Sequence, residues 1–124
     1  MAVKSYRDLI VWQKAMDVAD DIYSLTSRFP KNEAYGLTSQ LRRASVSIPS
    51  NIAEGQSRGT TTEFLRFLSI AQGSRAEVET QLLLSKRLAY IDDEELYKAL
   101  KDLEEIAKML HTLIESLTAK INGL

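Results

Sequence analysis

The sequence has no cysteine, a single histidine and no long uncharged run. Without cysteine, a disulfide framework, a thiol nucleophile and a zinc–thiolate site are excluded. The histidine, His111, has no second histidine near it, and no glycine-rich phosphate loop is present, so we expect no enzymatic activity, no metal and no cofactor. The longest uncharged run, Ala44 to Ala53, has ten residues and includes a proline, so no membrane-spanning helix is expected. The expected location is the cytoplasm.

Proline and glycine are also scarce, and they divide the chain into long helical segments. No window alternates apolar and polar residues with the period of a β-strand. The predicted helices span about residues 8–28, 32–54, 60–89 and 93–121. Their connections are short, which makes successive helices antiparallel neighbours. The predicted fold is therefore all-α, with one domain over residues 1–124 that forms an up-down-up-down antiparallel four-helix bundle.

Three helix starts are predicted from capping residues. Asn32 is expected to cap the second helix, because an asparagine oxygen accepts hydrogen bonds from the first free N–H groups. Thr60 and Glu63 have the spacing of a capping box at the start of the third helix. Asp92 and the acids after it are expected to cap the fourth helix, where the helix dipole favours negative charge.

The first helix has two apolar seams. One seam consists of Leu9, Trp12, Met16, Ala19 and Tyr23, and the other of Val11, Ala15, Val18, Ile22, Leu25 and Phe29. A surface helix in a monomeric bundle needs only one apolar stripe. Two seams therefore predict burial on two sides and a homo-oligomer, and a single wide stripe that faces the core is the alternative.

Pro49 interrupts a segment whose apolar residues follow helical spacing. Proline has no N–H, so the carbonyl of Ser45 loses its helical hydrogen bond, at a cost of about 3 kcal/mol. We therefore expect a kink in the second helix. Gly73, in the middle of the third helix, costs about 1 kcal/mol relative to alanine and permits close approach of another backbone. The sequence predicts that the Pro49 kink packs against Gly73.

Charge is distributed unevenly, although the net charge is only −1. Residues 28–75 contain seven basic and three acidic groups, whereas residues 92–105 contain seven acidic groups and two lysines. Solvated helix faces that follow the helix dipole are one explanation. A basic surface for nucleic acid is the other. The candidate residues for that surface are Arg42, Arg43, Arg58, Arg66 and Arg75.

A strip of polar residues follows one flank of the second helix. Its members are Arg43, Ser47, Asn51, Glu54 and Arg58. In a nucleic-acid-binding role, the arginines contact phosphates while Ser47 and Asn51 donate hydrogen bonds. In a structural role, Ser47 or Asn51 satisfies backbone groups freed by the proline, and Glu54 pairs with an arginine. The structural role is favoured, because the freed backbone groups need partners.

Several strings in the sequence resemble one known family. The first string, DLIVWQKA, runs from Asp8 to Ala15. The most specific string is SIPSNIAEG, from Ser47 to Gly55. Arg58 and Gly73 follow at the matching places. Over almost its whole length the sequence resembles the bacterial four helix bundle protein family, also called the 23S rRNA intervening-sequence proteins. The residues of the structural signature are Ser47, Pro49, Asn51, Glu54, Gly55 and Gly73.

The resemblance implies a bundle that assembles into a ring, commonly a homopentamer. The family is similar to the accessory variability determinants of diversity-generating retroelements, which form basic pentameric barrels that bind nucleic acid and reverse transcriptase. The leading hypothesis is therefore a non-enzymatic homo-oligomer that binds RNA or DNA through arginines gathered by assembly. The alternative is a protein-interaction scaffold or accessory subunit without nucleic-acid contact, whose partner is a protein encoded nearby. The acidic start of the fourth helix is then as good a docking face as the basic region.

Overall fold

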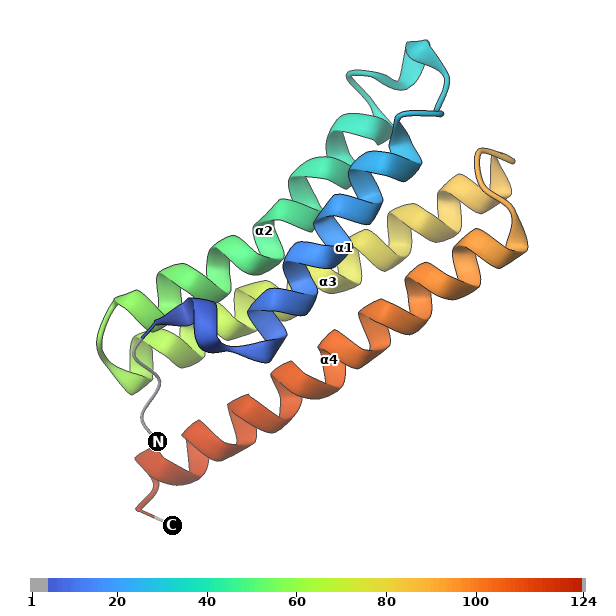
Figure 1. Ribbon diagram of the computed structural model, residues 1–124. Helices are drawn as coiled ribbons and strands as arrows, with labels where there is room; N and C mark the ends of the chain where they lie inside the picture. The colour runs from blue at the N-terminus through green and yellow to red at the C-terminus, as the bar shows by residue number, and fades with distance from the viewer. Residues whose placement is uncertain (1–4, 124) are drawn as a thin grey trace.

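The structure is a computed structural model that describes residues 5–123 (Figure 1). The long helices are α1 (Ile10–Thr26), α2 (Leu37–Ser57), α3 (Thr61–Arg87) and α4 (Asp93–Ile121), and the short 3₁₀ turns are η1 (Tyr6–Asp8) and η2 (Lys31–Glu33). No strand occurs among the described residues, so the prediction of an all-α fold with four helices is confirmed. Residues 1–4 and 124 of the predicted domain lie outside the described part. Within residues 5–123, no helix combines the length and apolarity needed to cross a membrane.

Two of the predicted helix starts have the expected caps. Thr60 Oγ1 accepts a hydrogen bond from the Glu63 N–H at 3.2 Å, and α3 begins at Thr61, directly after Thr60. The Glu63 carboxylate binds Arg66 rather than completing a capping box. Asp92 and Glu95 do form a reciprocal capping box at the start of α4, at distances of 2.8 and 3.0 Å. These caps satisfy backbone N–H groups that have no partner within their helix.

The start of α2 differs from the prediction. Asn32 is not its N-cap, because it lies in η2, and α2 begins at Leu37 after Gly36. The anchoring side chain is Glu33, whose Oε1 accepts from the Leu37 N–H at 3.1 Å and whose Oε2 accepts from the Tyr90 hydroxyl at 2.7 Å. These hydrogen bonds, that of Tyr90 first, lower the pKa of Glu33. A contact with the α3–α4 connection therefore fixes this helix start.

The four helices lie side by side, with their connections at the two ends of the molecule (Figure 1). Between α2 and α3, Ser47 contacts Ser74 and Gln40 contacts Gln81, so residue numbers rise on one helix as they fall on the other. These two helices therefore run antiparallel. All four helices contribute to the core. Its largest fully buried side chains are Ile22, Leu41, Ile48, Ile52, Leu68, Leu82, Leu103, Ile106 and Leu110.

The two apolar seams of α1 have different environments. The seam that contains Val11, Ala15 and Ile22 is buried in the core. The other seam is only partly covered, since Met16 is 40% exposed and Tyr23 is 46% exposed. A second, half-exposed seam is the feature from which an oligomer is predicted, and the oligomer itself stays a prediction.

The predicted contact between Pro49 and Gly73 is wrong within the chain. The helix α2 continues through Pro49, which is buried, but Gly73 is exposed, and a Cβ placed there would meet no atom within 4 Å. Successive side chains on a helix point about 100° apart, so Ser74 faces α2 while its neighbour Gly73 faces outward. Gly73 is therefore next to a residue that contacts α2, but its own position on α3 faces away from α2.

The close approach of α2 and α3 occurs at Gly55 instead. A Cβ at Gly55 would lie 2.6 Å from Phe67 Cβ and 3.2 Å from Phe64 Cδ1, which is too near for any side chain. A larger residue would push the two helices apart. Gly55 belongs to the signature string, and this helix contact is the physical reason for a glycine there.

Candidate functional site

The five candidate arginines do not form one surface within a single chain. Arg58 and Arg66 lie together at the turn between α2 and α3. Their guanidinium groups lie 5.0 and 4.5 Å from the centre of the Phe67 ring, and both contact Glu63. Arg58 also pairs with Glu54 at 2.7 Å, as expected for the structural role of that glutamate. The hydrogen bond from Arg66 lowers the pKa of Glu63, so this carboxylate carries a charge that offsets the two arginines beside it.

Arg42 and Arg75 are both held by contacts within the chain. Arg42 Nε donates to Thr26 Oγ1 at 2.9 Å, and its guanidinium lies 4.6 Å from the centre of the Tyr23 ring, so it ties α2 to α1. Arg75 pairs with Glu79 one turn along α3, and its side chain is only 20% exposed. The charge of each group is therefore partly committed inside the chain.

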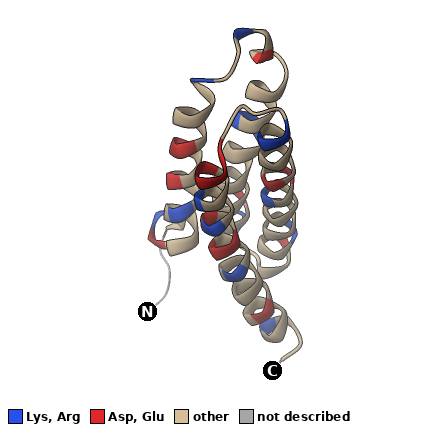
Figure 2. Cartoon of the chain, turned by 90° about the vertical axis from the view of Figure 1, so that its right-hand side faces the viewer, with Lys and Arg blue, Asp and Glu red and all other residues tan. Residues whose placement is uncertain are grey.

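Arg43 differs from the other four. It is exposed on α2, and it forms no salt bridge with any residue from 5 to 123. Elsewhere, basic and acidic residues follow one another along the helices, as the side facing the viewer in Figure 2 shows. Arg43 is thus the candidate whose charge is most available to an outside partner.

The polar residues Ser47, Asn51 and Ser74 join α2 to α3. The hydroxyl oxygens of Ser47 and Ser74 are 2.8 Å apart and hydrogen-bonded. Asn51 Nδ2 donates to the Ser47 carbonyl at 2.8 Å and to Ser47 Oγ at 2.9 Å. The carbonyl that Pro49 deprives of its partner belongs to Ser45, so the Asn51 amide does not serve that group. The hydrogen bond between Ser47 and Ser74 links α2 to α3, and Asn51 holds Ser47 from within α2.

An open groove of about 500 Å³ lies between α1 and α2, and we call it the α1–α2 groove. Its apolar walls are Trp12, Met16, Ala19 and Tyr23 on α1 and Val46, Pro49 and Ala53 on α2. At one end, the Tyr6 ring packs edge-on against Trp12, with ring centres 5.3 Å apart. Asp20 lines the groove on the α1 side. The half-exposed seam of α1 is therefore one wall of a concave apolar surface.

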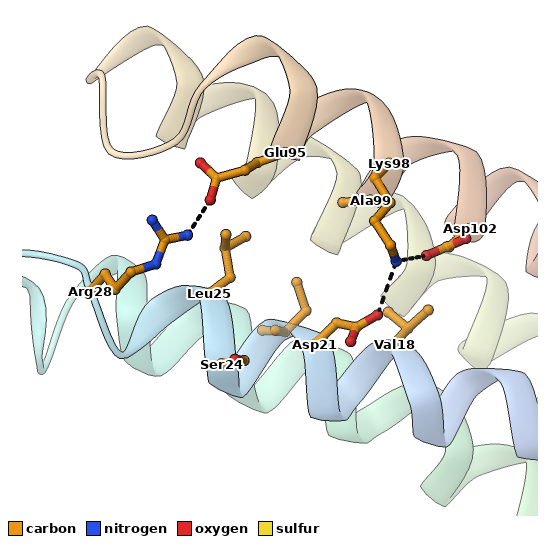
Figure 3. Close-up of a pocket in the computed structure, with 10 residues that line it drawn as sticks. Val18, Asp21, Ser24, Leu25, Arg28, Glu95, Lys98, Ala99 and Asp102 are labelled. Carbon is orange, nitrogen blue, oxygen red and sulfur yellow. Dashed lines mark hydrogen bonds and ion pairs between the residues drawn. The ribbon is translucent and has the colours of Figure 1, made fainter.

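A smaller cleft of about 220 Å³ lies between α1 and α4 (Figure 3). Its apolar side chains are Val18, Ile22, Leu25 and Ala99. Charged side chains bridge it: Arg28 pairs with Glu95, and Lys98 Nζ lies 2.9 Å from Asp102 Oδ2 and 3.4 Å from Asp21 Oδ2. These carboxylates, Asp102 first, raise the pKa of Lys98. Sequence reasoning misses this cleft, because the bridging pairs join residues 67 and 77 positions apart.

The described residues do not gather groups suited to catalysis at His111. This side chain is exposed on α4, where its Nε2 lies 3.4 Å from Glu115 Oε1. Between residues 5 and 123, no three His, Cys, Asp or Glu side chains are placed to hold a metal ion. The described surface instead offers an apolar groove, a bridged cleft and, among the five candidate arginines, one without an acidic partner, on a helical bundle.

The chain belongs to the 23S rRNA-intervening sequence protein family, whose model matches residues 7–112. The resemblance inferred from the signature strings is therefore confirmed. A solved structure with a similar fold is a protein of unknown function from the S23 ribosomal protein family of Bacteroides thetaiotaomicron. The two sequences are 28% identical, the match covers 85% of this chain and 98% of the other, and the TM-score is 0.76. No curated protein matches the chain. The description of the matching family names an intervening-sequence protein and no enzymatic activity.

Proposed function

We propose that the protein is a cytoplasmic, non-enzymatic homo-oligomer that binds RNA or DNA. In this proposal, bundles of up-down-up-down order, each with α2 bent at Pro49, form a pentameric ring whose arginines contact phosphates. One observation carries it: Arg43 is exposed, has no acidic partner among residues 5–123, and lies one turn from Val46 in the α1–α2 groove. When each subunit covers the groove of its neighbour, one copy of Arg43 recurs in every subunit of the ring. The electrostatic fields of these copies then add.

Assembly is supported by the exposed apolar surface of the groove. Met16 and Val46 are each 40% exposed, and Tyr23 is 46% exposed. Covering apolar surface stabilises a complex by about 25 cal/mol for each Å² removed from water. Contiguous apolar surface of this kind commonly marks an interaction site.

The candidate arginines are expected to contribute unequally to binding. Arg43 should contribute most, because no carboxylate offsets its charge. Arg58 and Arg66 should contribute less, since Glu54 and Glu63 lie against them, although the arginine side chains are 46% and 57% exposed. Arg42 and Arg75 are expected to act mainly through the stability of the bundle.

Fluorescence anisotropy with labelled structured RNA and labelled duplex DNA, at low and moderate salt, tests the proposal. Binding should weaken steeply as salt rises, because phosphate contacts release counterions. Arg43→Glu should weaken binding at least tenfold and reduce the salt dependence. The matched control is Lys101→Glu, an equal charge change at an exposed position of α4. Failure of the wild-type protein to bind either nucleic acid at low salt would refute this function.

The second candidate is a scaffold or accessory subunit that binds a protein encoded nearby and makes no nucleic-acid contact. It is favoured by the cleft between α1 and α4, where three carboxylates face only Arg28 and Lys98. An acidic cleft with an apolar floor suits a basic protein segment. Co-purification with the product of a neighbouring gene, lost on Glu95→Lys but unaffected by Arg43→Glu, would favour this candidate. Binding to nucleic acid without any such partner would oppose it.

A further inference from the structure

We infer that the interface between subunits is formed by the outer face of α3 of one copy, which enters the α1–α2 groove of the next copy. This inference rests on the assembly that the proposed function requires. We call the outer face of α3 the α3 ridge. Its residues are Arg66, Ile70, Gly73, Glu77, Thr80 and Leu84, and all of them are exposed.

The α3 ridge and the α1–α2 groove match in spacing. The ridge residues follow one another at intervals of four, three, four, three and four, which is the spacing of knobs-into-holes packing. The α1 wall of the groove follows intervals of four, three and four from Trp12 to Tyr23, and the α2 wall follows three and four from Val46 to Ala53. At 1.5 Å per residue, the α1 wall is about 16 Å long and the ridge from Ile70 to Leu84 is about 21 Å long. One helix therefore fits along the groove.

The α3 ridge, like the groove, exposes large apolar side chains. On the ridge, Ile70 is 41% exposed and Leu84 is 46% exposed, although both are large aliphatic residues. Between them, Gly73 gives no side chain to hold another helix away. The space above Gly73 is empty within the chain, so its helical cost of about 1 kcal/mol has no explanation in the packing of one subunit. A neighbouring subunit in the groove contact supplies that explanation.

Shape and charge favour ridge-to-groove contact over groove-to-groove contact. The groove is concave, and two concave surfaces do not fill one another, whereas the face of a helix is convex. Asp20 lines the groove and forms no salt bridge with residues 5–123. Arg87, one turn beyond Leu84, is exposed and likewise forms none with those residues. Contact between unlike surfaces is heterologous, and heterologous contacts form a ring when the rotation between successive subunits closes.

Two variants of the full chain test the inference by multi-angle light scattering after gel filtration. Gly73→Gln blocks the ridge and leaves the groove intact, and it adds a side chain where the subunit has open space. Met16→Glu places a charge in the groove and leaves the ridge intact. Each variant alone should have the mass of one chain, 14.0 kDa. An equal mixture should form a dimer and nothing larger, because only one compatible pair of surfaces remains.

Controls separate the possible failures. Thr118→Gln, the matched exposed substitution on α4, should keep the wild-type mass. Circular dichroism checks that the variants fold, and Leu84→Gln and Val46→Gln replace any that do not. A monomeric wild-type protein would overturn the proposed assembly itself. An oligomeric wild-type protein whose ridge and groove variants keep the full mass would overturn only this inference. Monomeric variants that do not combine on mixing would also overturn it, because they indicate a symmetric contact.

Discussion

The contact between α2 and α3 and the contact between α1 and α4 use different physical means within one bundle. On the α2–α3 side, Gly55 brings the helices so close that a Cβ would lie 2.6 Å from Phe67 Cβ, and Ser47 is hydrogen-bonded to Ser74. On the α1–α4 side, a cleft of about 220 Å³ is bridged by exposed ion pairs. Exposed ion pairs contribute little free energy, whereas a well-packed interface resists any change of volume. The stability of the bundle should therefore depend mainly on the contact between α2 and α3.

The largest effect on stability is expected for Gly55→Ala, which disturbs the close contact between α2 and α3. The added Cβ overlaps Phe67, so the free energy of unfolding should fall by about 1–3 kcal/mol. Urea denaturation followed by circular dichroism measures the change. The paired control is Gly73→Ala, with both substitutions measured in the Met16→Glu background, which is expected to be monomeric. There the added methyl group has open space, and the variant should gain up to about 1 kcal/mol through better helix propensity. Equal midpoints with and without Gly55→Ala would show that the close contact is not a constraint.

A double-mutant cycle on Ser47 and Ser74 measures a second contribution to the contact between α2 and α3. Each change to alanine should cost about 1 kcal/mol, because it leaves one partner of a partly buried hydrogen bond unpaired. The coupling free energy between the two changes should be about 0.5–1 kcal/mol. Ser69→Ala, an exposed serine on α3, is the control and should change stability little. Strict additivity of the two changes would contradict the predicted link between the helices.

The smallest effects are expected on the α1–α4 side. Arg28→Ala and Lys98→Ala should each cost less than about 1 kcal/mol, because both side chains are more than half exposed. That cost should shrink further as salt is added, because salt screens exposed charges. Lys120→Ala, an exposed lysine that forms no salt bridge with residues 5–123, is the control. If either variant lost as much free energy of unfolding as Gly55→Ala, the α1–α4 contact would be as important for stability as the α2–α3 contact, contrary to this prediction.

Much of the helical layout was predictable because its causes are local. The fourth helix spans residues 93–121 as predicted, since Asp92 and Glu95 lie within one turn of each other and cap it without help from the rest of the chain. The start of α3 after Thr60 has the same kind of cause. The start of α2 was not predictable in this way, because Glu33 reaches Tyr90, which is 57 residues away.

The candidate arginines also divide into features with local causes and features that depend on folding. The sequence indicates which arginines cluster in the chain, but their availability depends on carboxylates that folding places beside them. Glu63 lies between Arg58 and Arg66 because the turn after α2 brings the start of α3 back. Arg43 keeps an unpaired charge, since no acidic side chain of residues 5–123 lies within salt-bridge distance of it. Local helical spacing accounts for three pairings, those of Arg58 with Glu54, Arg66 with Glu63 and Arg75 with Glu79.

The helical class, the helix starts with local caps, the two apolar seams of α1 and the family follow from the amino-acid sequence. Those features depend on interactions within a few residues or on strings read directly from the chain. The packing of the helices, in contrast, sets which glycine meets a neighbouring helix and which seam stays half-exposed. It also sets which of the five candidate arginines lacks an acidic partner among residues 5–123. The physical reason is that a step of one residue turns a side chain by about 100°, so the same level along a helix can face the core or the solvent.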